Sequence, residues 1–426
     1  MTNEAKAIMA MAKALGASIA DYVPHVPAKT AADNSELAFS IDGDLLKKAL
    51  SKLMRVAKSP LYLHACDNAV EFKTRGGSFI VSKKISDNVK VTSAGKFIIP
   101  NTGAKMLAKV IGDARYTFTT KNHTLTIAGG DKTLTLKEQP EQLKLFNNSF
   151  SSVEAKSENV LTLAQSELKH LLNRTLYAAT KTLARSILTA VNFKAENDAL
   201  ILSATNGYRL AQATTNQFSL QGELNCSIDS DALRFILPLL NKGDVQISII
   251  SEHDVVISLN DLDINAKCWL EEYPDFARAI PTVNPVNAST SNSELQKALT
   301  LCKLFADEHN AISLCFERDG IFVAAERTGA GSARAGVQAD VSMAFSNAAV
   351  QVNVDYLLDS LKSLGKSIVT LGLSKNGITI REENLVAVMS GMLGSVQFNQ
   401  NQTACIAPPI PDKVTTIDIE AKVKVA

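Results

Sequence analysis

The chain has 426 residues, of which 46% are hydrophobic and 20% are charged, and its formal net charge is +1. This composition predicts a folded protein of two to four domains and excludes a disordered chain. The small net charge by itself neither favours nor excludes nucleic-acid binding, because a basic stripe can be compensated elsewhere on the surface. The six cysteines include no C-x-x-C pair, which predicts reduced thiols and no zinc site.

No part of the sequence is predicted to enter a membrane. Its apolar runs are of strand length or are interrupted by lysine, and residues 1–20 lack the continuous apolar core of a signal peptide. We therefore expect a soluble, cytoplasmic protein. Residues 1–36 are predicted to be an N-terminal extension, because Pro24 and Pro27 end an alanine-rich, helix-prone stretch.

From residue 37 onward, a pattern of strand, helix, strand, helix and hairpin recurs. The second helix of each copy follows Pro100, Asp229 or Asp355, so the copies are spaced by about 125 residues. The first helix of each copy is predicted at residues 44–58, 165–180 and 294–305. The pattern predicts three domains and a C-terminal extension, at residues 37–155, 156–284, 285–394 and 395–426.

The predicted helices are amphipathic and carry basic residues on their polar faces. In the first helix, Leu46, Leu50 and Leu53 lie on one face at helical spacing, and lysines occupy the other. For a single helix, a charged face is the ordinary solvated side of a helix that covers a sheet. Recurrence in three copies favours a shared basic surface, formed by Lys47, Lys52, Arg55, Lys105, Lys109, Lys169, Arg174, Arg234, Lys297, Lys303, Lys362 and Lys366. The fold class is predicted to be α+β, with two helices on an antiparallel sheet in each repeat.

A turn in the second repeat lies between two alternating apolar runs, residues 199–204 and 208–213. Its Asn206-Gly207 pair predicts a hairpin with a type I′ turn, in which both residues have positive φ. Taken alone, this segment indicates only a tight turn.

Four segments together resemble one family. The A-T-N-G-Y-R-L turn is followed by Y-P-D-F-A-R-A-I-P at residues 273–281, and the last third contains V-N-V-D-Y-L-L-D and V-A-V-M-S-G-M-L at residues 352–359 and 386–393. These segments are similar to the bacterial DNA sliding clamp, the beta subunit of DNA polymerase III. The resemblance extends from about residue 37 to residue 393.

The resemblance implies a non-catalytic ring that encircles double-stranded DNA and tethers the replicative polymerase. Two three-domain chains would join head to tail as a homodimer, with helices facing the DNA and sheets outside. The implied dimer contacts are Leu134, Leu136, Leu304 and Phe305. The polymerase and the clamp loader would dock short linear motifs into a pocket between the second and third domains, at Leu188, Thr205, Gly207, Tyr208, Arg209, Leu210, Pro274, Arg278, Ala279, Asn353, Tyr356, Val388, Met389, Met392 and Leu393.

No catalytic, metal or cofactor motif competes with this interpretation. The histidines are dispersed, and the glycines at 329, 331 and 336 are not followed by the Lys-Ser/Thr pair of a phosphate loop. Asp42-Gly43-Asp44 suits helix capping better than a metal pair. Two alternatives stay open: a scaffold with this fold that does not encircle DNA, and a DNA-modifying enzyme whose carboxylates converge only in space.

Overall fold

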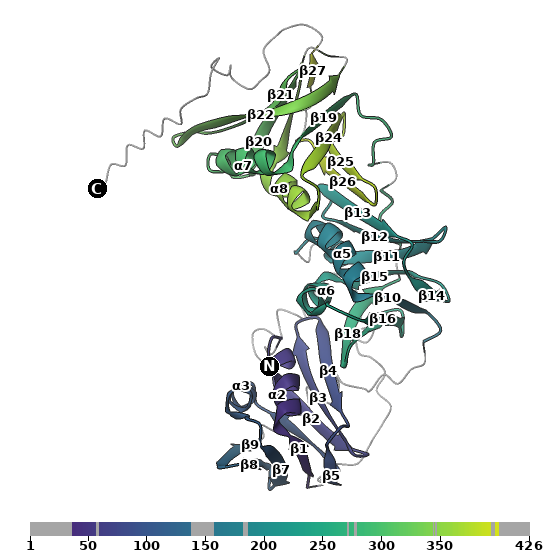
Figure 1. Ribbon diagram of the computed structural model, residues 1–426, viewed down its shortest axis with the longest axis vertical. Coiled ribbons are helices and arrows are strands. Elements are labelled where there is room, and N and C mark those ends of the chain that lie inside the picture. Colours follow the sequence, from purple (N-terminus) through teal and green to yellow (C-terminus); the bar gives the residue numbers. More distant parts are fainter. Residues whose placement is uncertain are drawn as a thin grey trace, which may run out of the picture. The chain divides into compact units, whose positions relative to one another are not determined.

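The computed structural model describes residues 36–56, 59–137, 157–181, 186–270, 272–276, 279–343, 345, 347–392 and the backbone of 397–399 (Figure 1). The predicted extensions, 1–36 and 395–426, therefore lie almost entirely outside the described residues. The chain divides into two compact units, Met1–Thr74 with Lys83–Glu154 and Arg75–Ser82 with Ala155–Ala426. The first repeat makes up most of the first unit, and the second unit contains the second and third repeats.

The first repeat consists of antiparallel strands and two helices. One sheet has the strand order β5-β1-β7-β8-β9, and β2 pairs with both β3 and β6. Residues 75–82, in β3 and β4, group with the second unit. The elements are β1 (Ala38–Asp42), α2 (Gly43–Leu53), β2 (Leu61–Cys66), β3 (Ala69–Gly76), β4 (Phe79–Ile85), β5 (Lys90–Ser93), β6 (Gly95–Ile99), α3 (Asn101–Val110), β7 (Arg115–Lys121), β8 (Thr124–Gly129) and β9 (Lys132–Lys137).

The second repeat has the same order of strand, helix, strands, helix and hairpin. Strand β10 pairs with β16, while β11 pairs with β12 and β15. The elements are β10 (Val160–Ala164), α5 (Gln165–Thr175), the 3₁₀ helices η2 (Leu176–Ala178) and η3 (Ser186–Thr189), β11 (Ala190–Glu196), β12 (Ala199–Thr205), β13 (Arg209–Thr215), β14 (Ser219–Gln221), β15 (Asn225–Asp229), α6 (Ser230–Ile236), the 3₁₀ helix η4 (Leu237–Leu239), β16 (Asp244–Ile249), β17 (Asp254–Leu259) and β18 (Leu262–Trp269).

The third repeat places α7 and α8 in contact over its strands (Figure 1). Its long strand β22 pairs with β21 along its first part and with β19 along its second. The elements are β19 (Val286–Ser291), α7 (Asn292–Lys303), β20 (Ala311–Glu317), β21 (Gly320–Arg327), β22 (Gly331–Met343), β23 (Asn347–Asn353), α8 (Val354–Ser363), β24 (Ile368–Ser374), β25 (Gly377–Glu382), β26 (Leu385–Ser390) and β27 (Gln397–Asn399).

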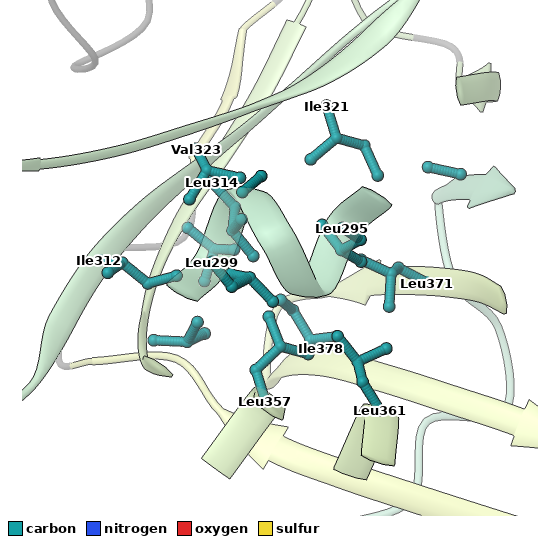
Figure 2. Packing of buried hydrophobic residues seen from close by; sticks show 14 of the residues in the cluster. Leu295, Leu299, Ile312, Leu314, Ile321, Val323, Leu357, Leu361, Leu371 and Ile378 are labelled. Atoms are coloured by element: carbon teal, nitrogen blue, oxygen red, sulfur yellow. The ribbon is translucent and has the colours of Figure 1, made fainter. Parts of the chain in front are cut away.

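The core of the third repeat lies between these two helices and the strands. Leu295 and Leu299 of α7 point toward Leu357 and Leu361 of α8, and all four side chains are fully buried (Figure 2). Their spacing of four residues places each pair on one face of its helix. Burial of a leucine side chain contributes about 1.5–3 kcal/mol, so this shared core fixes both helices on the sheet.

All three repeats join the start of the first helix to the loop after the second helix. In the first repeat, a Cβ at Gly43 would lie 2.1 Å and 2.4 Å from two carbonyl oxygens of that loop, so only glycine fits. In the second, the backbone amide of Gln165 donates to the carbonyl oxygen of Gly243 (2.8 Å). In the third, Asn292 donates from Nδ2 to that of Lys366 (3.2 Å). The repeat predicted from sequence is thus built around one equivalent junction.

The α+β class and the two helices of each repeat confirm the predicted fold. The side chain of Asp42 accepts a hydrogen bond from the amide of Asp44 (3.0 Å), so this carboxylate caps α2 as expected. The first helices end earlier than predicted, since α2 stops at Leu53 and α5 passes into a 3₁₀ helix at Leu176. Propensity and periodicity locate a helix better than its final turn.

The cysteine prediction is wrong at one position. Cys66, Cys226, Cys268 and Cys302 are free thiols, but Cys315 is disulfide-bonded. The spacing of cysteines indicates local pairs and metal motifs, and Cys315 belongs to no C-x-x-C pair that would have indicated a bond. Burial raises the pKa of the Cys302 thiol to about 11, which keeps that side chain protonated and unreactive near neutral pH.

Candidate functional site

The turn between β12 and β13 differs from the predicted type I′ turn. Within it, only Gly207 has positive φ (+90°). The side chain of Asn206 instead accepts hydrogen bonds from the amides of Tyr208 and Arg209, both at 3.0 Å. Asn favours this local arrangement because its short amide reaches backbone groups two and three residues ahead. The turn therefore consists of three residues and leaves the Tyr208 side chain 68% exposed.

Strand β13 joins the second repeat to the third. It pairs antiparallel with β26, with Arg209 opposite Met389 and Leu210 opposite Val388. Residues directly opposite in such a pair share one face of the sheet, and consecutive residues alternate between faces. Arg209 and Met389 thus lie on the face toward α8, where Ser360 donates its hydroxyl hydrogen to the Met389 sulfur (3.8 Å). Leu210 and Val388 lie on the other face.

The guanidinium of Arg209 is held by groups from both repeats. Its Nη1 is 2.7 Å from the Asp359 carboxylate, and its Nη2 donates to the carbonyl oxygen of Tyr177. The guanidinium carbon lies 4.5 Å from the ring centroid of Tyr356 and 5.3 Å from that of Tyr177. An arginine suits this position because its planar, delocalised charge can stack on rings while its edge donates hydrogen bonds.

A second ion pair crosses the same boundary. Arg174 of α5 contacts Glu382 at the end of β25 at 2.7 Å, and their side chains are only 11% and 7% exposed. A cavity of about 560 Å³ opens beside this pair and is lined by His170, Asn173, Arg174, Tyr177, Asp359, Lys362, Ser363, Leu364 and Gly365. Burial raises the pKa of Tyr177, so its phenol stays neutral there.

The remaining predicted pocket residues are distributed around this boundary. Thr205 is buried, and its backbone amide donates a hydrogen bond to the hydroxyl of Tyr273 (3.3 Å). Asn353 caps α8 by accepting from the amides of Asp355 and Tyr356. Leu188 is buried, Tyr356 and Met392 are half-buried, and Pro274 and Ala279 are exposed. Arg278 and Leu393 lie outside the described residues.

The structure therefore brings together only part of the predicted pocket. Arg209, Tyr356 and Met389 converge on one face, and Leu210 and Val388 meet on the other. Tyr177, Asp359 and Glu382 complete the boundary but were not among the predicted residues. Asp359 belongs to the Y-L-L-D segment, which is the one sequence signal that could have identified it.

Most of the predicted basic residues are exposed. Lys47, Arg55, Lys105, Lys109, Lys297, Lys303, Lys362 and Lys366 are exposed, and Lys52 and Lys169 are half-buried. Lys303 is ion-paired with Asp355. Arg174 is 9% exposed and paired with Glu382, and Arg234 donates to the carbonyl oxygen of Leu176 (3.2 Å). Arg174 thus serves an internal contact and does not belong to the predicted basic surface, whereas half-buried Arg234 stays a prediction.

The predicted dimer residues lie at or beside strand edges. Leu134 and Leu136 are half-buried on β9, which pairs only with β8 among the described strands. Leu304, just after α7, is 71% exposed. Phe305 packs beside β22, because a Cβ at Gly331 would lie 3.1 Å from its ring.

The described residues contain neither a membrane-spanning helix nor a cluster of metal ligands. Within the ranges given above, no helix is both long and apolar enough to cross a membrane. The same residues contain no group of three or more His, Cys, Asp or Glu side chains placed to hold a metal ion.

Comparisons with known proteins agree in pointing to one family. Residues 162–275 match the family described as the DNA polymerase III beta subunit, central domain, and residues 277–388 match the C-terminal domain of the same subunit. A beta sliding clamp of Synechococcus elongatus is 27% identical over 228 residues, which are 52% of this chain and 60% of that protein. One of Chlamydia muridarum is 24% identical over 351 residues, which are 78% of this chain and 90% of that protein.

Solved structures show the same fold. A DNA polymerase sliding clamp from Pseudomonas aeruginosa aligns with a TM-score of 0.75 and 20% identity, over 84% of this chain and 99% of that one. The sliding clamp from Bacillus subtilis aligns with a TM-score of 0.75 and 19% identity, over the same shares of the two chains. Because the two consecutive domain matches together cover more than half of the sequence, the chain belongs to the DNA polymerase III beta subunit family.

Proposed function

We propose that this protein is a DNA sliding clamp, a ring that encircles duplex DNA and tethers a replicative polymerase to its template. The observation that carries this function is the pair of consecutive family matches across the second and third repeats, residues 162–275 and 277–388. The first repeat has the same order of elements and supports a chain of three equivalent domains. The proposed role is mechanical, and it requires no bond-making chemistry from the protein.

The exposed lysines on the helices give this role a physical basis. Lys297 on α7 and Lys362 on α8 are exposed, as are Lys47 and Lys105 on the helices of the first repeat. Such side chains attract phosphates without reading bases, so binding does not depend on sequence and the protein can slide. We propose that these residues face the DNA.

A closed ring requires a second copy of the chain. We propose a head-to-tail homodimer in which the free edge of β9 from one copy meets the free edge of β22 from the other. Among the described strands, residues 331–338 of β22 pair only with β21, so their other edge has no strand partner. Pairing across copies would extend the sheet at this edge, and closure of the ring removes edges that otherwise favour aggregation.

We also propose that the polymerase and the clamp loader bind at the boundary of the second and third repeats. The exposed Tyr208 lies next to β26, because the amide of Ser390 donates to its carbonyl oxygen (2.9 Å). The predicted pocket contains four more apolar residues that are at least partly accessible. Pro274 and Ala279 are exposed, and Tyr356 and Met392 are half-buried. Aromatic and aliphatic anchors of this kind can carry most of the binding energy of a short motif.

Retention on circular and linear DNA tests the proposed function. The protein is loaded on a nicked plasmid by a clamp loader, and half of the sample is then linearised with a restriction enzyme. A ring stays on the circle and slides off the free ends, so gel filtration should show DNA-bound protein only with the circle. Equal retention on both forms would instead indicate a scaffold that binds one side of the duplex, and metal-dependent loss of DNA would indicate an enzyme.

Removing three exposed lysines should weaken DNA binding at every sequence. In the triple variant Lys297→Ala, Lys362→Ala and Lys366→Ala, each lost phosphate contact should flatten the plot of log affinity against log salt by about 0.9. The matched control replaces Lys84, Lys121 and Lys375, which are exposed on strands or their turns. The measurement is fluorescence anisotropy of labelled duplex DNA across a salt titration. Equal slopes for the two triple variants would show that Lys297, Lys362 and Lys366 belong to an ordinary solvated surface.

A further inference from the structure

Each side-chain nitrogen of Arg209 is either engaged by another group of the chain or buried. Nη1 contacts Asp359, Nη2 donates to the carbonyl oxygen of Tyr177, and Nε is buried without a hydrogen-bond partner. The side chain is only 11% exposed. Because both repeats already engage this guanidinium and little of it is exposed, a docked peptide has little access to it. The resemblance to the family placed Arg209 among the residues that touch a docked motif, whereas in the structure its guanidinium contacts groups of both repeats.

The groups that hold Arg209 lie on one face of α8. Tyr356 and Asp359 are three residues apart, so their side chains are neighbours on the helix surface. Arg209 stacks on the ring of Tyr356 at 4.5 Å while it pairs with the carboxylate of Asp359 at 2.7 Å. These two contacts fix the rotation of α8 about its own axis relative to β13, and with it the direction of the Tyr356 side chain.

The start of α8 is also fixed by its own repeat. Asn353 accepts from the amides of Asp355 and Tyr356, and its Nδ2 donates to the carbonyl oxygen of His309 (2.8 Å). Within the third repeat, this cap sets where the first turn begins. Arg209 connects that turn, through the Tyr356 ring, to the hairpin that carries the exposed Tyr208.

We infer that Arg209 is a positioning residue of the partner site: it orients Tyr356 toward a docked motif and does not contact the motif itself. This inference rests on the proposed function of the boundary as a docking site for short motifs. It predicts that the contribution of Arg209 to binding passes through the Tyr356 ring. Two residues coupled in this way show non-additive effects in a double-mutant cycle.

The test measures binding of a fluorescein-labelled Gln-Leu-Ser-Leu-Phe peptide to the full chain by fluorescence anisotropy. Arg209→Met and Tyr356→Ala should each weaken binding about tenfold. Tyr356→Ala removes the aromatic anchor, and Arg209→Met removes the contact that orients this anchor. The double variant should bind within about twofold of Tyr356→Ala alone. Arg209→Lys should recover part of the affinity, since it keeps the charge opposite Asp359 but loses the planar fork.

Arg174→Met is the matched control. It removes another buried arginine that pairs with a carboxylate across the same boundary. The partner of Arg174 is Glu382 of β25, whereas Arg209 contacts Asp359 and Tyr356 of α8. Its peptide affinity should stay within about twofold of the unmodified protein. An equal loss in Arg174→Met would mean that Arg209 acts only by stabilising the boundary, which would overturn the inference.

Two further results would also overturn the inference. Additive losses in the Arg209 and Tyr356 variants would mean that Arg209 binds the peptide directly, and an unchanged affinity in Arg209→Met would mean that it has no role in docking. Asp359→Asn provides a milder second variant if Arg209→Met does not fold, and its loss should again disappear in the Tyr356→Ala background. Failure of the unmodified chain to bind the peptide would reject the proposed docking function itself, a result distinct from these.

Discussion

Replacing Leu304 with glutamate should convert the proposed dimer into monomers. Leu304 is 71% exposed, and it stands beside Phe305 and the open edge of β22. A large apolar side chain contributes about 1.5–3 kcal/mol when it is buried in an interface, and a ring closed by two equivalent contacts would lose about 3–6 kcal/mol. A buried, unpaired carboxylate adds a further penalty. Sedimentation velocity over a nanomolar to micromolar concentration range measures the shift in the dimer dissociation constant.

Ile368→Glu is the control for this prediction. Ile368 is also a branched aliphatic residue with high exposure (64%), but it begins β24 and lies outside the proposed contact. Its dimer should dissociate at the same concentration as the unmodified protein. A Leu304→Glu variant that stays dimeric at nanomolar concentration would place the contact between copies elsewhere.

Replacing Glu382 with alanine should strongly destabilise the second unit. The carboxylate is 7% exposed and is the partner of Arg174, whose side chain is 11% exposed. Removing one member of a buried ion pair leaves an uncompensated charge, which typically costs about 3–5 kcal/mol. The expected result is a lower midpoint of urea unfolding for the transition of this unit, followed by circular dichroism.

Two variants separate the charge effect from other causes. Glu383→Ala removes the adjacent, exposed carboxylate in the turn after β25, and its free energy of unfolding should change by less than about 0.5 kcal/mol. Replacing both members of the pair, with Arg174→Met and Glu382→Leu, should recover most of the lost stability, because a buried ion pair is often no better than apolar groups of similar volume. A loss below about 1 kcal/mol in Glu382→Ala would show that water reaches Arg174 and compensates its charge.

Residues that are adjacent in a family motif do not all face a binding partner, as the boundary between the second and third repeats shows. The motif that resembles the family contains Arg209 and Leu210 side by side, but strand alternation places their side chains on opposite faces of the sheet formed with β26. A list of motif residues therefore mixes those that can contact a partner with those that hold the site in shape. Separating the two groups requires the pairing register and the contacts of each side chain.

The sequence alone was sufficient for the features that depend on local pattern. The apolar face of α2, the cap at Asp42, the hairpins and the spacing of the repeats all follow from neighbouring residues, whose preferences act before any distant contact forms. The family and the α+β class followed from these features and from the quoted motifs. These features depend on interactions between residues close together in the sequence, so they can be predicted without coordinates.

Only the tertiary structure decided what individual charged and polar side chains do. Arg174 and Lys362 both stand in helices among the predicted basic residues, yet the first is buried against Glu382 and the second is exposed. Glu382 is 208 positions away from Arg174 in the sequence. The free energy of a charge depends on whether folding removes its water and which opposite charge it then meets, and both are set by strands that pair across the boundary of two repeats.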